Sequence, residues 1–239
     1  MSVMVDRMTV KIFADGADLE GIFALLADPR IAGFTTNPSL MWKAGLTDYR
    51  EFAARLLDRV TSHPISFEVF ADDAEEMRRQ AHLIAGWGEN VYVKIPVSTT
   101  QGVSMAPLAR ELSESGIKVN VTALFTTAQV ELLTEAVRDG APSCLSVFAG
   151  RIADAGIEPV PLMERALEIM EAAPRSELIW ASPREILNVV QADRIGCHII
   201  TVTHDLLAKL DLLGKDLAQY SLETVQMFHR DAVSAGFSL

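Results

Sequence analysis

Short apolar runs alternate with amphipathic segments along nearly the whole chain. Several of the runs are rich in β-branched or aromatic residues and are bounded by Gly, Pro, Asn or Asp, which is typical of short buried strands. We expect strands over residues 10–14, 33–36, 65–70, 91–96, 118–124, 144–148, 178–181 and 198–202. Each strand is followed by apolar residues at helical spacing, so the pattern predicts repeated strand and helix units.

The helices are expected over residues 18–26, 48–60, 73–87, 104–115, 161–172 and 204–213, with two more opening near residues 126 and 182. Thr126 and Gln129 have the spacing of a capping box, and Thr203 is placed to cap the helix that follows it. The run Ser182-Pro183-Arg184-Glu185 combines an N-cap residue, a proline at the first helical position and a capping glutamate. It predicts a helix start at Ser182.

Eight strand and helix units, spaced by roughly 20 to 35 residues, predict a protein of the α/β class with a (β/α)8 barrel fold. An open, doubly wound sheet is the alternative, and the lack of a Gly-x-Gly-x-x-Gly turn makes it weaker. We expect one domain over residues 1–239. Residues 214–239 are surplus to the barrel and predict a C-terminal helical extension, packed on the barrel or on a neighbouring subunit.

Composition and charge narrow the possible partners. The chain has 239 residues, 49% of them hydrophobic, and a net charge of −11, so its overall field repels nucleic acids and anionic membranes while still permitting local sites for small anions. Cys144 and Cys197 each lie in an apolar run, which indicates buried thiols in a reducing compartment. Residues 1–9 lack a signal-peptide core and no apolar run approaches the length of a membrane span. We therefore expect a cytoplasmic protein.

One lysine interrupts an apolar strand near its end. Lys94 lies in the run Val91-Tyr92-Val93-Lys94-Ile95-Pro96. Burial in a low dielectric disfavours an ammonium ion, so a buried lysine tends to become a nucleophilic amine that can form a Schiff base with a ketone. The alternative is a side chain that extends from the strand end into solvent.

Polar residues stand at or just after the ends of most predicted strands, where a (β/α)8 barrel builds its active site. Taken singly, such residues are commonly helix caps or turn residues. Together they supply an amine, two carboxylates, hydroxyls and amides, which is the set that Schiff-base chemistry needs without a metal or cofactor. The set is Asp15, Thr35, Asn37, Glu68, Lys94, Asn120, Thr122, Ser146, Arg151, Ser182 and Arg184.

Arg151 and Arg184 follow the sixth and seventh predicted strands, close to the place where such barrels often bind phosphate. Two guanidinium groups and the backbone amides of a helix starting at Ser182 would suit a terminal anion. The alternative is that both arginines make ordinary surface salt bridges.

Seven motifs in the same order resemble the transaldolase family, in the small, single-barrel branch that also contains fructose-6-phosphate aldolases. They are Phe13-Ala14-Asp15, Thr35-Thr36-Asn37-Pro38-Ser39-Leu40, Phe67-Glu68-Val69, Val93-Lys94-Ile95-Pro96, Asn120-Val121-Thr122-Ala123-Leu124-Phe125, Phe148-Ala149-Gly150-Arg151-Ile152 and Ala181-Ser182-Pro183-Arg184. The resemblance implies that Lys94 is the Schiff-base lysine, that Asp15 is the acid/base, and that Glu68 and Thr122 order a catalytic water. It further implies a substrate-binding set of Thr35, Asn37, Asn120, Ser146, Phe148, Arg151, Ser182 and Arg184. Within this set, Arg151, Ser182 and Arg184 would bind the phosphate.

The resemblance implies a transaldolase, which transfers a dihydroxyacetone unit from a ketose phosphate to an aldose or aldose phosphate acceptor. The family's aldolases, which release dihydroxyacetone, carry glutamine at the position of Glu68 and tyrosine at that of Phe148, so both positions favour transfer. A sugar-phosphate-binding barrel without catalysis is the alternative of another class. The small members form rings of five or paired rings, which implies a homo-oligomer.

Three departures from the family pattern flank the expected donor and anion sites. The chain has Ser146-Val147-Phe148-Ala149-Gly150-Arg151 where the family usually has Ser-Pro-Phe-Val-Gly-Arg, and Pro183-Arg184-Glu185 replaces Phe-Arg-Asn. Gly16 stands where a small hydroxyl or another turn residue is usual. The resemblance therefore defines the type of reaction more closely than the sugar. The histidines, including His204 near the rim, are expected to be structural.

Overall fold

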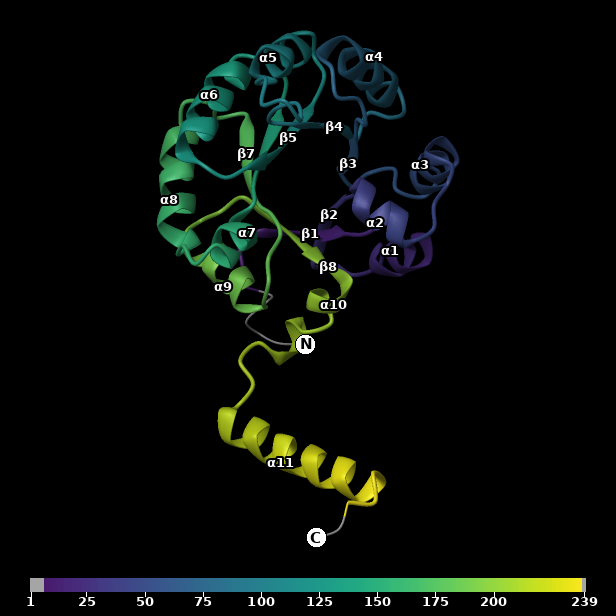
Figure 1. The fold of residues 1–239 in the computed structure, drawn as a ribbon, viewed down its shortest axis with the longest axis vertical. Helices are drawn as coiled ribbons and strands as arrows, with labels where there is room; N and C mark the ends of the chain where they lie inside the picture. The colour runs from purple at the N-terminus through teal and green to yellow at the C-terminus, as the bar shows by residue number, and fades with distance from the viewer. Residues whose placement is uncertain (1–6, 238–239) are drawn as a thin grey trace.

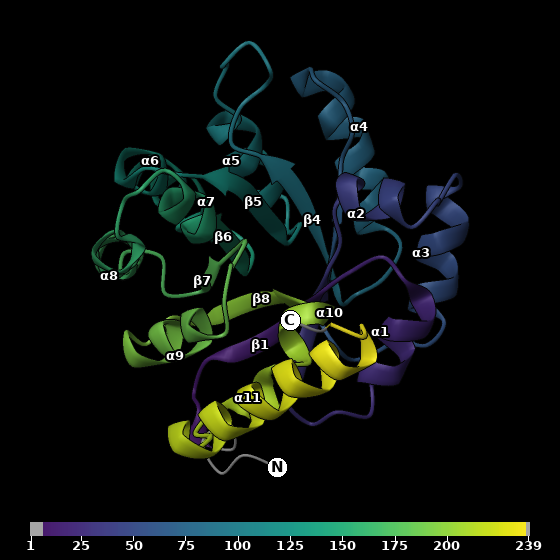
Figure 2. The same cartoon turned by 60° about the horizontal axis from the view of Figure 1, so that its bottom comes forward.

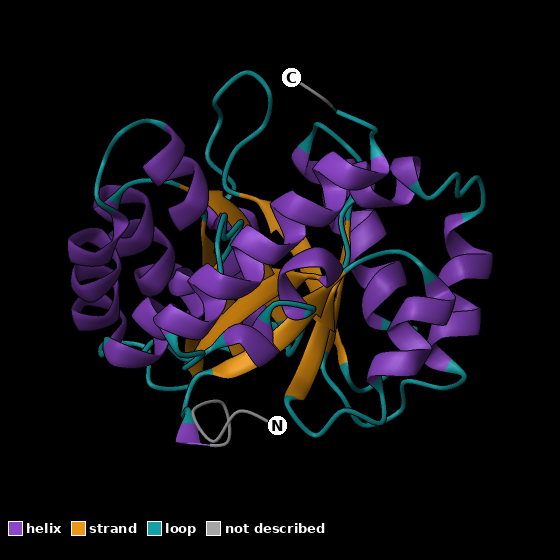
Figure 3. Ribbon diagram, turned by 90° about the horizontal axis from the view of Figure 1, so that it is seen from below, coloured by secondary structure: helices purple, strands orange, loops and turns teal. Residues whose placement is uncertain are grey.

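The computed structural model describes residues 7–237. Residues 1–6 and 238–239, which belong to the predicted N-terminal segment and C-terminal extension, lie outside the described residues. Eight strands form a closed barrel in sequence order, and every pair of neighbouring strands is parallel. Helices surround the strands (Figures 1 and 3). The (β/α)8 prediction is confirmed, and the open doubly wound sheet is wrong because β1 pairs with β8.

Each predicted strand overlaps an observed one. The strands are β1 Lys11–Asp15, β2 Ile31–Thr35, β3 Ile65–Glu68, β4 Val91–Pro96, β5 Val119–Leu124, β6 Ser143–Val147, β7 Ser176–Trp180 and β8 Ile199–Thr203. Alternate residues of a strand face opposite sides of the sheet. Phe13, Cys144 and Ile199 accordingly form a small apolar cluster inside the barrel, and a larger core lies between strands and helices.

The predicted helices are also present, with shifted ends. They are α1 Leu19–Leu25, α3 Tyr49–Leu57, α4 Ala74–Ala85, α5 Ala106–Glu114, α6 Thr127–Val137, α8 Pro159–Met170, α9 Leu187–Arg194 and α10 His204–Leu207. The capping box of Thr126 and Gln129 is confirmed. Two short helices without a counterpart in the sequence analysis, α2 Pro38–Lys43 and α7 Ala149–Asp154, follow β2 and β6 and therefore border the carboxyl end of the barrel.

The predicted helix start at Ser182 is wrong. Helix α9 begins at Leu187, and Ser182 adopts a left-handed backbone conformation with φ 59°. The backbone N–H groups of Arg184 and Glu185 instead donate to Oδ1 of Asn188. A side chain farther along the chain thus satisfies the donors that an N-cap at Ser182 would have served.

The segment after β8 also differs from its prediction. The helix expected over residues 204–213 is divided into α10 and the 3₁₀ helix η2, Leu210–Leu212. Thr203 occupies the N-cap position of α10, but its side chain makes no capping bond and donates to the Asp205 carboxylate instead.

The predicted C-terminal helical tail is present as α11, Leu217–Ser234. None of its residues is buried, and its apolar side chains include Leu217 at 79% and Phe228 at 62% exposure. The helix extends away from the barrel in Figure 1 and lies in front of it in Figure 2. Within residues 7–237, no helix has both the length and the apolar character needed to cross a membrane.

Candidate active site

A cavity of about 620 Å³ opens at the carboxyl end of the barrel strands. Its lining contains all the residues predicted for the site except Asn120. The predicted residues that line it are Asp15, Thr35, Asn37, Glu68, Lys94, Thr122, Ser146, Phe148, Arg151, Ser182 and Arg184.

The strand register explains why these side chains meet. Glu68 on β3 is paired with Lys94 on β4, and Lys94 is paired with Asn120 on β5. Paired residues on parallel strands lie side by side and point to the same face. Thr122 lies two residues beyond Asn120 and therefore faces the same side, one layer closer to the rim.

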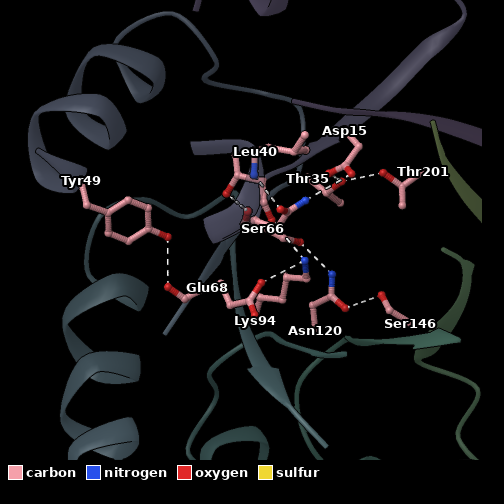
Figure 4. Close-up of polar contacts among 12 residues, drawn as sticks. Asp15, Thr35, Leu40, Tyr49, Ser66, Glu68, Lys94, Asn120, Ser146 and Thr201 are labelled. Atoms are coloured by element: carbon pink, nitrogen blue, oxygen red, sulfur yellow. Dashed lines mark hydrogen bonds and ion pairs between the residues drawn. The ribbon is translucent and has the colours of Figure 1, made fainter. Parts of the chain in front are cut away.

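Lys94 is buried, with 7% of its surface exposed, and it lines the cavity. Its Nζ lies 3.1 Å from Oε2 of Glu68 and donates a hydrogen bond of 3.2 Å to the backbone carbonyl of Thr36 (Figure 4). The amine is thus held by one carboxylate and one carbonyl. The predicted alternative, a lysine that extends into solvent, is wrong.

Asp15 ends β1 and lines the cavity, where its side chain is partly buried. Burial raises the pKa of the Asp15 carboxyl, and this effect outweighs the opposing influence of Lys94 and of hydrogen bonds from Thr35 and Asn37. Thr35 Oγ1 donates to Oδ1 at 2.7 Å, and Asn37 Nδ2 donates to Oδ2 at 3.4 Å. Asp15 is therefore a carboxyl group whose protonated form is favoured more than in water.

Both donors to Asp15 are oriented by a second contact. Oδ1 of Asn37 accepts from the backbone N–H of Leu40 and caps α2, which leaves its Nδ2 to face Asp15. Thr35 Oγ1 lies 2.5 Å from Thr201 Oγ1 on β8. Because Thr35 gives its only hydroxyl proton to Asp15, the hydroxyl of Thr201 supplies the proton shared between the two threonines.

Asn120 does not line the cavity but supports Ser146, which does. It is fully buried, donates from Nδ2 to Oγ of Ser66 at 3.0 Å and accepts from Oγ of Ser146 at 2.7 Å. These bonds connect β3, β5 and β6 below the cavity (Figure 4). The structure thus shows Asn120 orienting Ser146, which itself lines the cavity.

Thr122 lines the cavity with a buried hydroxyl that makes no hydrogen bond within the described part of the chain. Such groups are uncommon in proteins. The residue after it, Ala123, has a left-handed φ of 64°, and the pairing of β5 with β6 shifts register between Val121 and Leu124. The irregularity falls where the strand meets the cavity. Among the described residues, the buried Thr122 hydroxyl is therefore an unpaired polar group in the cavity wall.

Arg151 and Arg184 reach the cavity from separate elements. Arg151 belongs to α7, and its guanidinium carbon lies 5.0 Å from the ring centre of Phe148. Arg184 lies in the loop between β7 and α9 and forms an ion pair with Asp154. The backbone amides predicted from a helix start at Ser182 are not available in that form, since α9 begins five residues later at Leu187.

Two contacts near the site, one made by Tyr49 and one between His204 and the glycines of the first loop and helix, were not predicted from the sequence. Tyr49 on α3 donates from its hydroxyl to the backbone carbonyl of Glu68 at 3.1 Å, and burial raises the pKa of this tyrosine. His204 packs where a Cβ atom on Gly16 would lie 3.0 Å from its ring and one on Gly21 would lie 2.6 Å from it. A side chain at position 16 would therefore press against the His204 ring.

The cavity thus combines a buried amine, two guanidinium groups, hydroxyl and amide donors and three carboxyl groups at one end of a barrel. The carboxyl groups are those of Asp15, Glu68 and Asp205, and the last was not among the residues predicted for the site. Within residues 7–237, no group of three or more His, Cys, Asp or Glu side chains could hold a metal ion. The class that the fold and the cavity define is a (β/α)8 barrel with a ligand cavity at the carboxyl end of its strands, in which a buried amine lies beside a carboxylate.

Comparison with known proteins gives the family. Residues 12–239 match the model of the Transaldolase/Fructose-6-phosphate aldolase family. The chain is 37% identical over 202 residues to a probable transaldolase of Streptococcus equi subsp. zooepidemicus, covering 84% of this chain and 90% of the relative. A probable transaldolase of Methanococcus maripaludis is 36% identical, with 84% and 89% covered. The chain belongs to the transaldolase/fructose-6-phosphate aldolase family, and its function is of the transaldolase or aldolase type.

Solved structures with the same fold are more distant in sequence. A putative fructose-1,6-biphosphate aldolase from Coccidioides immitis superposes with a TM-score of 0.54 at 16% identity, covering 90% of this chain and 83% of the other. KGPDC from Streptococcus mutans gives a TM-score of 0.58 at 11% identity, covering 82% and 89%. At these identities the likeness supports the barrel fold alone.

Proposed function

We propose that the protein is a transaldolase that transfers a dihydroxyacetone unit from a ketose phosphate to an aldose or aldose phosphate through a Schiff base on Lys94. The observation that carries the proposal is the buried amine of Lys94, held 3.1 Å from Glu68 in a cavity at the carboxyl end of the barrel. Family membership and relatives named probable transaldolase support the same reaction class.

In the proposed first half-reaction, Glu68 takes the proton that the Lys94 ammonium must lose, directly or through a water held with Thr122. The neutral amine attacks C2 of the ketose, and the carbinolamine loses its oxygen as water to give an iminium ion. Thr122 suits the water-binding role because its buried hydroxyl has no other hydrogen-bond partner within residues 7–237.

Asp15 then removes the proton of the C4 hydroxyl while the bond between C3 and C4 breaks. The bonding electrons move to the iminium nitrogen, leaving an enamine on Lys94 and releasing the shortened aldose. The second half-reaction reverses these steps with the acceptor, and hydrolysis frees the new ketose and the amine. Burial raises the pKa of Asp15, which suits a carboxyl group that must alternate between base and acid.

Substrate binding follows from the remaining cavity residues. We assign sugar hydroxyl contacts to Thr35, Asn37 and Ser146, with Asn120 supporting Ser146 from below, and we place the terminal anion between Arg151 and Arg184 beside Ser182. Phe148 forms the apolar wall on which Arg151 rests. Planar guanidinium groups bind phosphate bidentately, which supports sugar phosphates as the substrate class.

With fructose 6-phosphate alone, dihydroxyacetone release is expected to be at least about tenfold slower than transfer to added erythrose 4-phosphate. We expect transfer because the chain has Glu68 and Phe148 at the two positions where the resemblance gives the family's aldolases glutamine and tyrosine. The two rates are measured by following free dihydroxyacetone and the seven-carbon product in parallel. Equal rates would favour a fructose-6-phosphate aldolase, and binding without either product would favour a non-catalytic sugar-phosphate-binding barrel.

Replacing Arg184 by alanine is expected to raise the KM for phosphorylated donors about tenfold, because a charged hydrogen-bond donor to the anion is removed. The KM for unphosphorylated donors should change less than twofold. Arg165→Ala is a matched control, since Arg165 forms a half-exposed ion pair with Glu168 on α8 and does not line the cavity. An equal rise for both kinds of donor would contradict the anion-binding role.

We further propose that residues 1–239 act as one domain in a cytoplasmic homo-oligomer. The exposed apolar side chains of α11 support association between copies, because large exposed apolar patches mark interaction sites. Rings of five or paired rings are the form implied by the family resemblance. Sedimentation of the purified protein tests this, with a stable monomer as the contradicting result.

A further inference from the structure

The guanidinium group of Arg184 is held on one edge by a carboxylate outside the predicted set. Its Nε donates to Oδ1 of Asp154 at 3.1 Å, and its Nη2 donates to Oδ2 of the same residue. This is the bidentate, planar form of an arginine–carboxylate pair. Nη1 makes no hydrogen bond within residues 7–237, so one edge of the guanidinium group is used and another is left for a ligand.

Asp154 occupies a particular position relative to both arginines of the cavity. It lies on α7 three residues after Arg151, so the two side chains are neighbours on one face of that helix. Two guanidinium groups that converge on a cavity repel each other until an anion arrives. The Asp154 carboxylate, which binds Arg184 directly and lies three residues after Arg151 on α7, reduces this repulsion.

The backbone around Arg184 is already fixed by close contacts with α7 and α9. A Cβ atom on Gly150 would lie 1.6 Å from the carbonyl oxygen of Ser182, so the loop approaches α7 as closely as only glycine permits. At the other side, Asn188 accepts from the backbone N–H of Arg184 at 2.8 Å. With the backbone held, the remaining freedom is in the long Arg184 side chain, and Asp154 restricts it.

We propose that Asp154 is a positioning residue of the anion-binding site, which holds Arg184 next to Arg151 before the anion binds. This inference rests on the proposed function, since it deepens the role assigned there to the two arginines. Ordering a long side chain in advance lowers the entropy cost of binding. Asp154 itself needs no contact with the substrate.

Asp154 could instead compete with the anion for Arg184, and this role predicts the opposite change in phosphate affinity. If phosphate used the Nε and Nη2 edge of Arg184, Asp154 would compete with it, and removing the carboxylate would strengthen phosphate binding. If Asp154 positions the arginine, removing the carboxylate weakens phosphate binding. The sign of one measured change therefore separates the two roles.

The test compares Asp154→Asn, which keeps the shape and removes the charge, with Asp154→Glu and with the matched control Glu168→Gln. Inorganic phosphate is titrated into each protein by calorimetry, which requires no turnover. We expect Asp154→Asn to weaken phosphate binding about three- to fivefold, the upper range for exposed ion pairs. Asp154→Glu should recover most of this loss, and Glu168→Gln should bind like the unmodified protein.

Kinetics give an independent readout. Asp154→Asn should raise the KM for fructose 6-phosphate by the same three- to fivefold, with kcat unchanged and with unphosphorylated donors unaffected. In an Arg184→Ala background, Asp154→Asn should have no further effect on phosphate binding, because the carboxylate acts through Arg184. If Asp154→Asn does not fold, Asp154→Ser is tested in its place.

Tighter or unchanged phosphate binding in Asp154→Asn would overturn the positioning role. The role would also be overturned if Asp154→Asn weakened phosphate binding as much in the Arg184→Ala background as in the unmodified protein. Failure of the proposed reaction is distinguishable from these outcomes, because it would appear as the lack of a Lys94 adduct with any ketose while the phosphate titrations kept their pattern.

Discussion

Lys94→Met is expected to lose at least about 10⁴-fold in kcat, in line with the loss of other covalent nucleophiles. Methionine has a similar length and fills the buried site but cannot form an imine. The described cavity lining contains no second lysine that could replace it. Turnover of fructose 6-phosphate with erythrose 4-phosphate is the measurement, with circular dichroism to show that the barrel is retained.

Lys118→Met is the matched control. Lys118 precedes β5 at the opposite end of the barrel, donates to the backbone carbonyl of Glu89 and is absent from the cavity lining. Its replacement should leave kcat within about twofold, as expected for a side chain outside the site. Retention of more than a tenth of the activity in Lys94→Met would contradict covalent catalysis by this lysine.

Asp15→Asn is expected to lower kcat by about 10²- to 10⁴-fold, the range for removal of a general acid or base. An amide at this position can still accept from Thr35 but cannot take the proton of the C4 hydroxyl. Formation of the first imine on Lys94 should continue, so borohydride should still trap the donor. Rapid-quench kinetics would separate imine formation from bond cleavage, and equal loss of both steps would contradict the role assigned to Asp15.

Asp15→Asn is also expected to change the pH dependence of the unfolding free energy. Burial raises the pKa of Asp15 above its ordinary value of 3.8, so the folded protein holds this proton more tightly than the unfolded chain. Folding stability is therefore lost as the pH rises from about 3.8 through the raised pKa, and the loss persists above it. Asp15→Asn should consequently raise the unfolding free energy at pH 7 and should give no gain below pH 3.8. Urea unfolding at both pH values checks the sign.

Lys94 and Glu68 were identifiable from the sequence because each interrupts an apolar strand near its end, where packing offers no reason for a charge. The alternation of apolar strands and amphipathic helices then predicts the barrel, and the barrel fold brings the carboxyl ends of the strands together. Thr36 and Tyr49 could not be found in this way. Thr36 contributes a backbone carbonyl to Lys94, and Tyr49 approaches Glu68 from α3, so neither contact has a local sequence signal.

The loop after β7 shows how tertiary contacts override local preference. Ser182, Pro183 and Glu185 carry the signals of a helix start, yet Asn188 takes the backbone N–H groups and Gly150 brings α7 against the carbonyl of Ser182. These contacts depend on residues that are distant in sequence or on a side chain one helical turn away. Helices α2 and α7 were not predicted because each has only six residues, too few for a helical period to be recognised.

The most direct test of a Schiff-base mechanism is reduction of the unmodified protein with borohydride in the presence of a ketose phosphate, followed by peptide mass mapping. A stable added mass on a single peptide that contains Lys94 is the predicted result. The absence of an adduct, or an adduct on Lys118 instead, would contradict the mechanism.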